Sequence, residues 1–160
     1  MEKEIALKPM TRDMCHDFYR MFKNDAAVFA PDQAFEEYEY SPEKVERYWR
    51  EQDVPDRRVF AIMLDDEMIG EVKLKYINVE KAECSMGIHL LDDTVKGKGY
   101  GTRAEQLVLN YAFDVLKMKA VHADALLANT RSQHVLEKVG FRYVRQDERF
   151  KYYLCERKDR

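Results

Sequence analysis

The stretch from Ser85 to Thr102, SMGIHLLDDTVKGKGYGT, decides the fold of this chain. Its first part, Ser85–Leu91, predicts a strand. The glycine-containing part at the end of the stretch opens a strongly periodic helix. Between them, Gly97, Gly99 and Gly101 let the backbone approach a ligand closely, and free N–H groups at the helix start face an anion. The stretch therefore predicts a strand–loop–helix unit that cradles a phosphate group.

The spacing of these glycines separates the loop from two better-known phosphate loops. The pattern is GxGxG and not GxGxxG, and it follows a meander late in the chain, so a dinucleotide-binding fold fits poorly. No Gly-Lys-[Ser/Thr] ends the loop, which excludes a Walker A motif. Taken alone, the loop is also compatible with a tight connection that binds nothing.

Upstream of the loop, the residue pattern predicts a short first strand, then two helices, and then three antiparallel strands. Thr11 starts the first helix, and Ser41 with Pro42 starts the second. On the first helix, Met14, Phe18, Met21 and Phe22 are expected to face inward. The strands are expected at Glu4–Lys8, before the helices, and at Arg58–Leu64, Met68–Val79 and Ala82–Leu91 after them.

Downstream of the loop, the pattern predicts helix, strand, helix and hairpin. The first helix carries one apolar face, made of Ala104, Leu107, Val108, Tyr111, Ala112 and Val115. A strand over Ala120–Ala128 leads to a helix capped by Asn129 and ended by Gly140, and a hairpin runs to about Glu156. The fold class is therefore α/β, an α+β sandwich around a single, mostly antiparallel mixed sheet, in one domain over residues 1–160.

Composition limits the class of protein. The 160 residues are 46% hydrophobic and 36% charged, with a net charge of −3, which argues against general nucleic-acid binding. The charged N-terminus does not resemble a signal peptide, and no apolar run of about 18 residues predicts a membrane span. Cys15, Cys84 and Cys155 show no CxxC spacing, so we expect reduced thiols in the cytoplasm, and neither disulfides nor a metal site.

Three segments in the same order resemble the GNAT N-acetyltransferase superfamily. Lys96–Gly101 is similar to its pyrophosphate loop [QR]-x-x-G-x-[GA], with lysine at the first position. Asn129–Phe141 resembles its N-x-x-[AS]…E-K-x-G-F segment, and Gly87–Asp92 occupies the place of its central strand. The resemblance is strongest to the branch of ribosomal-protein N-terminal and spermidine acetyltransferases.

This resemblance implies acetyl-CoA as cosubstrate and a GNAT-like core that binds it. The strand would pair its backbone with the pantetheine arm, the loop amides would hold the pyrophosphate, and Asn129 would meet the cosubstrate where two parallel strands diverge. The implied cosubstrate-binding residues are His89, Leu90, Leu91, Lys96, Gly97, Lys98, Gly99, Tyr100, Gly101, Thr102, Arg103, Asn129 and Ser132. Arg103 replaces a common glutamate, and it either binds phosphate or points into water.

Proton transfer is the open part of the implied chemistry. An alkyl ammonium has a pKa of about 10.4 and must lose a proton before it attacks. Asp124 and Glu83 are the candidate bases, and for both the alternative is a solvated strand residue. The tyrosine acid of many relatives is replaced by Leu136, and Ser132, one turn earlier, is the third candidate catalytic residue.

The acceptor is expected to be a cationic primary amine, such as a polyamine or a protein N-terminus. The segment from Asp32 to Glu46 is acidic and aromatic, which suits an ammonium group by charge and by cation–π contact. A solvated helix face with core aromatics explains the same residues. A non-catalytic acyl-CoA sensor and a nucleotide-binding protein are the alternative functions, and a homodimer is compatible with the resemblance.

Overall fold

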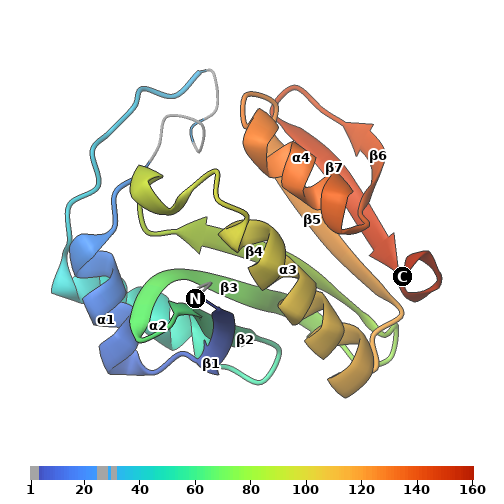
Figure 1. Ribbon diagram of the computed structural model, residues 1–160, viewed down its shortest axis with the longest axis horizontal. Helices are drawn as coiled ribbons and strands as arrows, with labels where there is room; N and C mark the ends of the chain where they lie inside the picture. Colours follow the sequence, from blue (N-terminus) through green and yellow to red (C-terminus); the bar gives the residue numbers. More distant parts are fainter. Residues whose placement is uncertain (1–3, 25–28, 30–31) are drawn as a thin grey trace.

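A seven-stranded sheet forms the centre of the molecule (Figure 1). The computed structural model describes residues 4–24, 29 and 32–160. Only β4 and β5 run parallel, and all other neighbours are antiparallel, in the order β1-β2-β3-β4-β5-β7-β6. The strands are β1 (Ile5–Pro9), β2 (Arg58–Leu64), β3 (Glu67–Asn78), β4 (Glu83–Leu90), β5 (Ala120–Leu126), β6 (Arg142–Gln146) and β7 (Phe150–Glu156). The predicted sheet and meander are confirmed.

Helices cover both faces of this sheet, and strand alternation shows which residues each face buries. On β2, Ala61 and Met63 pack with α1 (Arg12–Met21) and α2 (Pro42–Gln52). The intervening Ile62 and Leu64 belong to the larger core under α3 (Tyr100–Asn110) and α4 (Thr130–Val139). Figure 1 shows α3 and α4 neighbouring each other on one face, while α1 and α2 pack together at the β1–β3 end. We call these the α3/α4 face and the α1/α2 face.

The helix ends lie where the sequence places them. The Thr11 side chain accepts a 3.2 Å hydrogen bond from the Met14 N–H, and Ser41 accepts one from the Lys44 N–H. The Asn129 side chain caps α4 in the same way, at 3.2 Å from the Ser132 nitrogen. Gly140 ends α4 with a φ of 114°, a left-handed conformation that glycine adopts without strain.

Two residues that were expected to face inward are exposed instead. Val115 is 61% exposed, because a π-helical turn over Tyr111–Val115 follows α3 and shifts the residues that follow around the helix axis. Its i+5 geometry is visible in the 3.1 Å hydrogen bond from the Leu116 N–H to the Tyr111 carbonyl. Met21, at the last position of α1, is 66% exposed, since the buried stripe of that helix runs through Cys15, Phe18 and Tyr19.

The remaining features bear on the class of protein. Among the described helices, none has the length and apolar character needed to cross a bilayer. All three cysteines are buried and unbonded. The described residues hold no group of three or more histidine, cysteine or acidic side chains arranged to bind a metal ion.

Candidate functional site

The two parallel strands diverge in the middle of the sheet. β4 and β5 pair at three positions, from Glu83 opposite Ala120 to Ser85 opposite His122. Beyond Ser85, β4 keeps β3 on one edge as far as Leu90, while no described strand pairs with its other edge. A strand edge of this kind accepts an extended chain through its backbone N–H and C=O groups.

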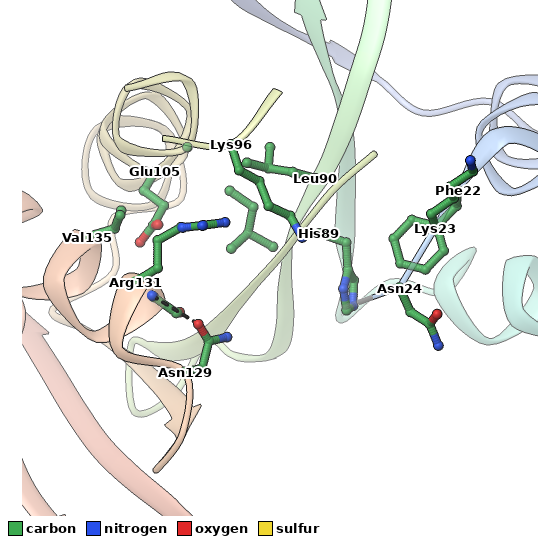
Figure 2. A pocket seen from close by; sticks show the side chains of 13 residues that line it. Phe22, Lys23, Asn24, His89, Leu90, Lys96, Glu105, Asn129, Arg131 and Val135 are labelled. Carbon is green, nitrogen blue, oxygen red and sulfur yellow. Dashed lines mark hydrogen bonds between the residues drawn. The ribbon is translucent and has the colours of Figure 1, made fainter. Parts of the chain in front are cut away.

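A cavity of about 120 Å³ lies at this gap (Figure 2). β4 contributes Ile88, His89 and Leu90, and the segment after α1 contributes Phe22, Lys23 and Asn24. The opposite wall comes from the loop, α3 and the start of α4, and it consists of Lys96, Gly101, Glu105, Asn129, Arg131, Ser132 and Val135. The cavity therefore joins the end of β4 to the start of two helices.

The glycine loop borders the cavity and leaves the start of α3 open. Gly97 and Gly99 adopt φ angles of 72° and 86°, and a Cβ atom at either position would meet no atom within 4 Å. Gly99 is the N-cap residue of α3, and no side chain caps that helix. The first N–H groups of α3 are thus available to an anion, which the helix dipole also favours.

Six of the thirteen predicted cosubstrate-binding residues line the cavity. His89, Leu90, Lys96, Gly101, Asn129 and Ser132 line the cavity, and the intervening loop residues connect Lys96 to α3. The Leu91 backbone is already bonded on both sides, through its N–H to Ile69 and its carbonyl to Lys23. Arg103 lies elsewhere, in a surface depression that it shares with Lys138 and Arg160.

The three predicted catalytic residues are not brought together. Ser132 lines the cavity. Asp124 lines a separate cavity of about 440 Å³, where it stands opposite Tyr152 across β5 and β7. The carboxylate of Glu83 is 3.7 Å from the His122 ring, at the paired end of β4. Leu136, at the position of the usual tyrosine, is buried in the core.

A titratable group that sequence reasoning missed is Glu105, on the α3 wall of the cavity. Its side chain is buried, with only 2% of its surface exposed, and Oε1 has no hydrogen-bond partner among the described residues. Burial raises its pKa to about 8, from an ordinary value of 4.5. The available signal was its spacing of four and eight residues before Leu109 and Phe113, which are also buried.

The side chain of His89 is the second such group. Ile88 and Leu90 pack into the α3/α4 core, so His89 projects toward the α1/α2 face, where its ring meets Phe22 edge-on at 6.0 Å. Burial lowers its pKa, and the neighbouring lysines Lys73, Lys75 and Lys96 act in the same direction. The imidazole is therefore neutral at pH 7 and can accept a proton.

Behind His89 lies a buried carboxylate. Glu71 stands directly opposite His89 in the β3–β4 register and is fully buried. Its Oε1 accepts hydrogen bonds from the hydroxyls of Tyr19, at 2.9 Å, and Tyr48, while Oε2 has no partner in the described part of the chain. In the sequence, Glu71 alternates with Gly70 and Val72, and this pattern predicts that Glu71 faces solvent. The strand pattern alone does not show that α1 and α2 cover this face of the sheet.

The acidic segment from Asp32 to Glu46, which runs into α2, is partly neutralised. Asp32 pairs with Arg149 at 2.6 Å, and Glu46 pairs with Arg12 at 2.7 Å. Glu36 and Glu37 are exposed. The Asn24 side chain, which lines the cavity, donates to the Glu36 carbonyl and accepts from the Tyr38 N–H. The segment is therefore attached to the rim of the cavity, although residues 25–28 and 30–31 lie outside the described part.

Comparison with known proteins agrees with this geometry. The family model described as acetyltransferase (GNAT) domain matches residues 4–142. The probable N-acetyltransferase YjcK of Bacillus subtilis is 32% identical over 143 residues, covering 88% of this chain and 74% of that protein. Spermidine N(1)-acetyltransferase of Escherichia coli K12 is 28% identical over 138 residues, with coverages of 86% and 72%.

A solved structure shows the same fold. Spermidine N-acetyltransferase from Vibrio cholerae, in complex with CoA and spermine, superimposes with a TM-score of 0.79 at 18% sequence identity. The match covers 97% of this chain and 96% of that one. The predicted α/β architecture is thereby confirmed.

Proposed function

Because the chain belongs to the acetyltransferase (GNAT) family and uses acetyl-CoA as cosubstrate, we propose that its acceptor is a cationic primary amine. A polyamine or a protein N-terminus has this chemistry. In the proposal, the amine attacks the acetyl group directly while both substrates are bound. One domain over residues 1–160 carries this activity, and the buried, unbonded cysteines suit a cytoplasmic protein.

The diverging strands carry the cosubstrate part of the proposal. The free edge of β4 from residue 86 to Leu90 offers backbone partners to an amide-containing arm, and Asn129 faces it from the end of β5. At the end of this edge, the uncapped start of α3 offers N–H groups to a diphosphate. A linear molecule with a diphosphate at one end and a narrow arm at the other matches both features.

The acceptor part rests on the opposite side of the cavity. Phe22 lines this side and contacts Tyr38 edge-on, with ring centroids 5.2 Å apart, and the exposed Glu36 and Glu37 precede Tyr38 in the chain. Aromatic rings and carboxylates both attract an ammonium group. The spermidine acetyltransferases among the relatives support a polyamine, within the wider class of cationic amines.

Turnover with a panel of amines tests the proposal. Acetyl-CoA is mixed with spermidine, a peptide with a free N-terminus, an aminoglycoside and a neutral aromatic amine, and thiol release is followed. We expect release with one of the cationic amines, well above the rate of acetyl-CoA hydrolysis. Release only with the neutral amine would refute the acceptor class, and acetyl-CoA binding without release from any amine would favour a sensor.

A further inference from the structure

We propose that His89 and Glu105 are the base and the acid of the transfer, acting from opposite walls of one cavity. His89 takes the proton of the attacking amine, and Glu105 gives a proton to the departing sulfur of CoA. The inference rests on the proposed function, and it assigns proton transfer to two side chains that sequence reasoning did not consider for it.

The position of His89 suits the base. It lies on the last part of β4, beside the unpaired edge, and its side chain points to the face where Phe22 and Asn24 form the acceptor wall. Figure 2 shows His89 between Leu90 and Phe22, on the side of the cavity away from Glu105. An amine that enters from the α1/α2 face therefore meets this imidazole before it reaches α3.

The position of Glu105 suits the acid. Its side chain lies on α3, among Val135, Leu90 and Arg131, and Figure 2 shows it on the same side of the cavity as Asn129. Oε1 is buried without a partner among the described residues, which is costly unless a ligand supplies a hydrogen bond. Of the other groups on the cavity wall, Ser132 is too weak an acid to protonate a thiolate with a pKa of about 8.5.

Burial, more than the surrounding charges, keeps both groups neutral. His89 faces Glu71, Lys73 and Lys75 from β3 and Lys96 from the loop, and burial outweighs the opposing effect of Glu71. Glu105 shares the cavity with Arg131 and Lys96, and burial is the cause of its raised pKa. At neutral pH the cavity therefore holds an unprotonated imidazole that can act as a base and a protonated carboxyl that can act as an acid.

The step is balanced. The ammonium form of the acceptor first loses one proton to solvent. The nitrogen of the resulting neutral amine then forms a bond to the acetyl carbon, the carbon–sulfur bond breaks, and the electron pair of that bond stays on sulfur. One proton moves from nitrogen to the His89 ring, and one moves from the Glu105 carboxyl to sulfur. The resulting imidazolium and carboxylate return to their neutral forms by exchanging protons with solvent.

The pH dependence of kcat tests the pair, measured at saturating acetyl-CoA with the best amine of the panel. The wild type should give a bell-shaped profile, with an acid limb below pH 6.5 and an alkaline limb near pH 8. His89→Gln should lower kcat about 100-fold or more and remove the acid limb. Glu105→Gln should lower kcat at least about tenfold and remove the alkaline limb, with the Kd of CoA changed less than about threefold.

Two control variants and one variant of the competing base accompany these measurements. His134→Gln and Glu80→Gln change exposed residues of the same types and should keep the wild-type profile. Asp124→Asn is measured beside them, because Asp124 is the competing base. A limb that disappears in Asp124→Asn and survives in His89→Gln would overturn the assignment of His89.

A titration that does not depend on turnover separates this inference from the proposed function. The His89 imidazole and the Glu105 carboxyl are followed by NMR in the enzyme without substrates. Midpoints below 6.5 for His89 and at about 8 for Glu105 are expected. A Glu105 midpoint near 4.5 would overturn the inference even if amines are acetylated, whereas a lack of thiol release with every amine would refute the function together with the inference that rests on it.

Discussion

The hydroxyl of Tyr19 donates a 2.9 Å hydrogen bond to the carboxylate of Glu71, and this bond joins α1 to the middle of the sheet. Tyr48 brings α2 to the same carboxylate oxygen, and Lys73 donates a 3.1 Å hydrogen bond to the Tyr48 hydroxyl. The network fixes both helices over the face that His89 shares. Its integrity therefore affects both stability and the acceptor wall of the cavity.

Removing one of these hydroxyls should destabilise the fold. In Tyr19→Phe, the buried carboxylate of Glu71 loses one of its two donors, and we expect a loss of about 1–3 kcal/mol in the free energy of unfolding. Urea denaturation measures this loss. Tyr143→Phe is the matched control, because its hydroxyl bonds Gln146 on the exposed hairpin and should matter by less than about 0.5 kcal/mol. Equal effects in the two variants would show that the network contributes no stability.

Acetyl-CoA should stabilise the protein through the glycine loop. A ligand at 100 times its Kd adds about 2.7 kcal/mol, which a thermal melt detects. Gly99→Asp should abolish this gain, because it places a negative side chain in the space beside the uncapped start of α3. Gly99→Ala is the control for backbone strain at a φ of 86° and should keep part of the gain. An undiminished gain in the Asp variant would mean that the diphosphate binds elsewhere.

Glu105 should make the protein less stable as the pH rises. Its pKa of about 8 in the folded state exceeds the ordinary 4.5, so between these values the folded protein binds more protons than the unfolded chain. Stability contributed by the neutral form is thus lost progressively from pH 4.5 to about pH 8. Glu105→Gln should be more stable than the wild type at pH 8, on the order of several kcal/mol, and the difference should shrink toward pH 5. Urea denaturation at both pH values measures this difference, with Glu80→Gln as the control. A difference in the free energy of unfolding that is the same at pH 5 and pH 8 would show that the pKa of Glu105 is not raised by burial.

The exposed carboxylates before α2 should steer a cationic acceptor. Electrostatic steering weakens with salt, because the screening length falls from roughly 10 Å at 0.1 M to about 3 Å at 1 M. The kcat/KM for the amine should therefore fall with salt more steeply than the affinity for CoA. Reversing the charge of Glu36 and Glu37 to lysine should remove most of this dependence.

The control for steering reverses two exposed charges outside the segment before α2. Asp56→Lys with Glu80→Lys changes exposed residues near the end of β3 and should leave the salt dependence intact. If both double variants lose the salt dependence equally, the net charge of the protein matters and the segment before α2 has no special role.

The sequence by itself determined the local elements of the fold and the ligand loop. Glycines at 97 and 99, capping residues at 11, 41 and 129, and strand alternation in the meander act through neighbours in the chain, so their effects can be inferred without a structure. The prediction that Val115 faces inward was wrong, because the local pattern assumes an ideal helix. A single π-helical turn displaces every later residue from that helical face.

Only the tertiary structure decided which titratable groups share the cavity. Glu71 looks exposed in the strand pattern and becomes fully buried under α1 and α2, while Asp124 lies outside the cavity although its strand ends beside it. Glu105 is an ordinary helical glutamate in the sequence, and packing around α3 removes it from water. Burial depends on contacts between distant segments, and burial sets the protonation state of His89 and Glu105, so the acid–base chemistry of the site emerges only when the chain is folded.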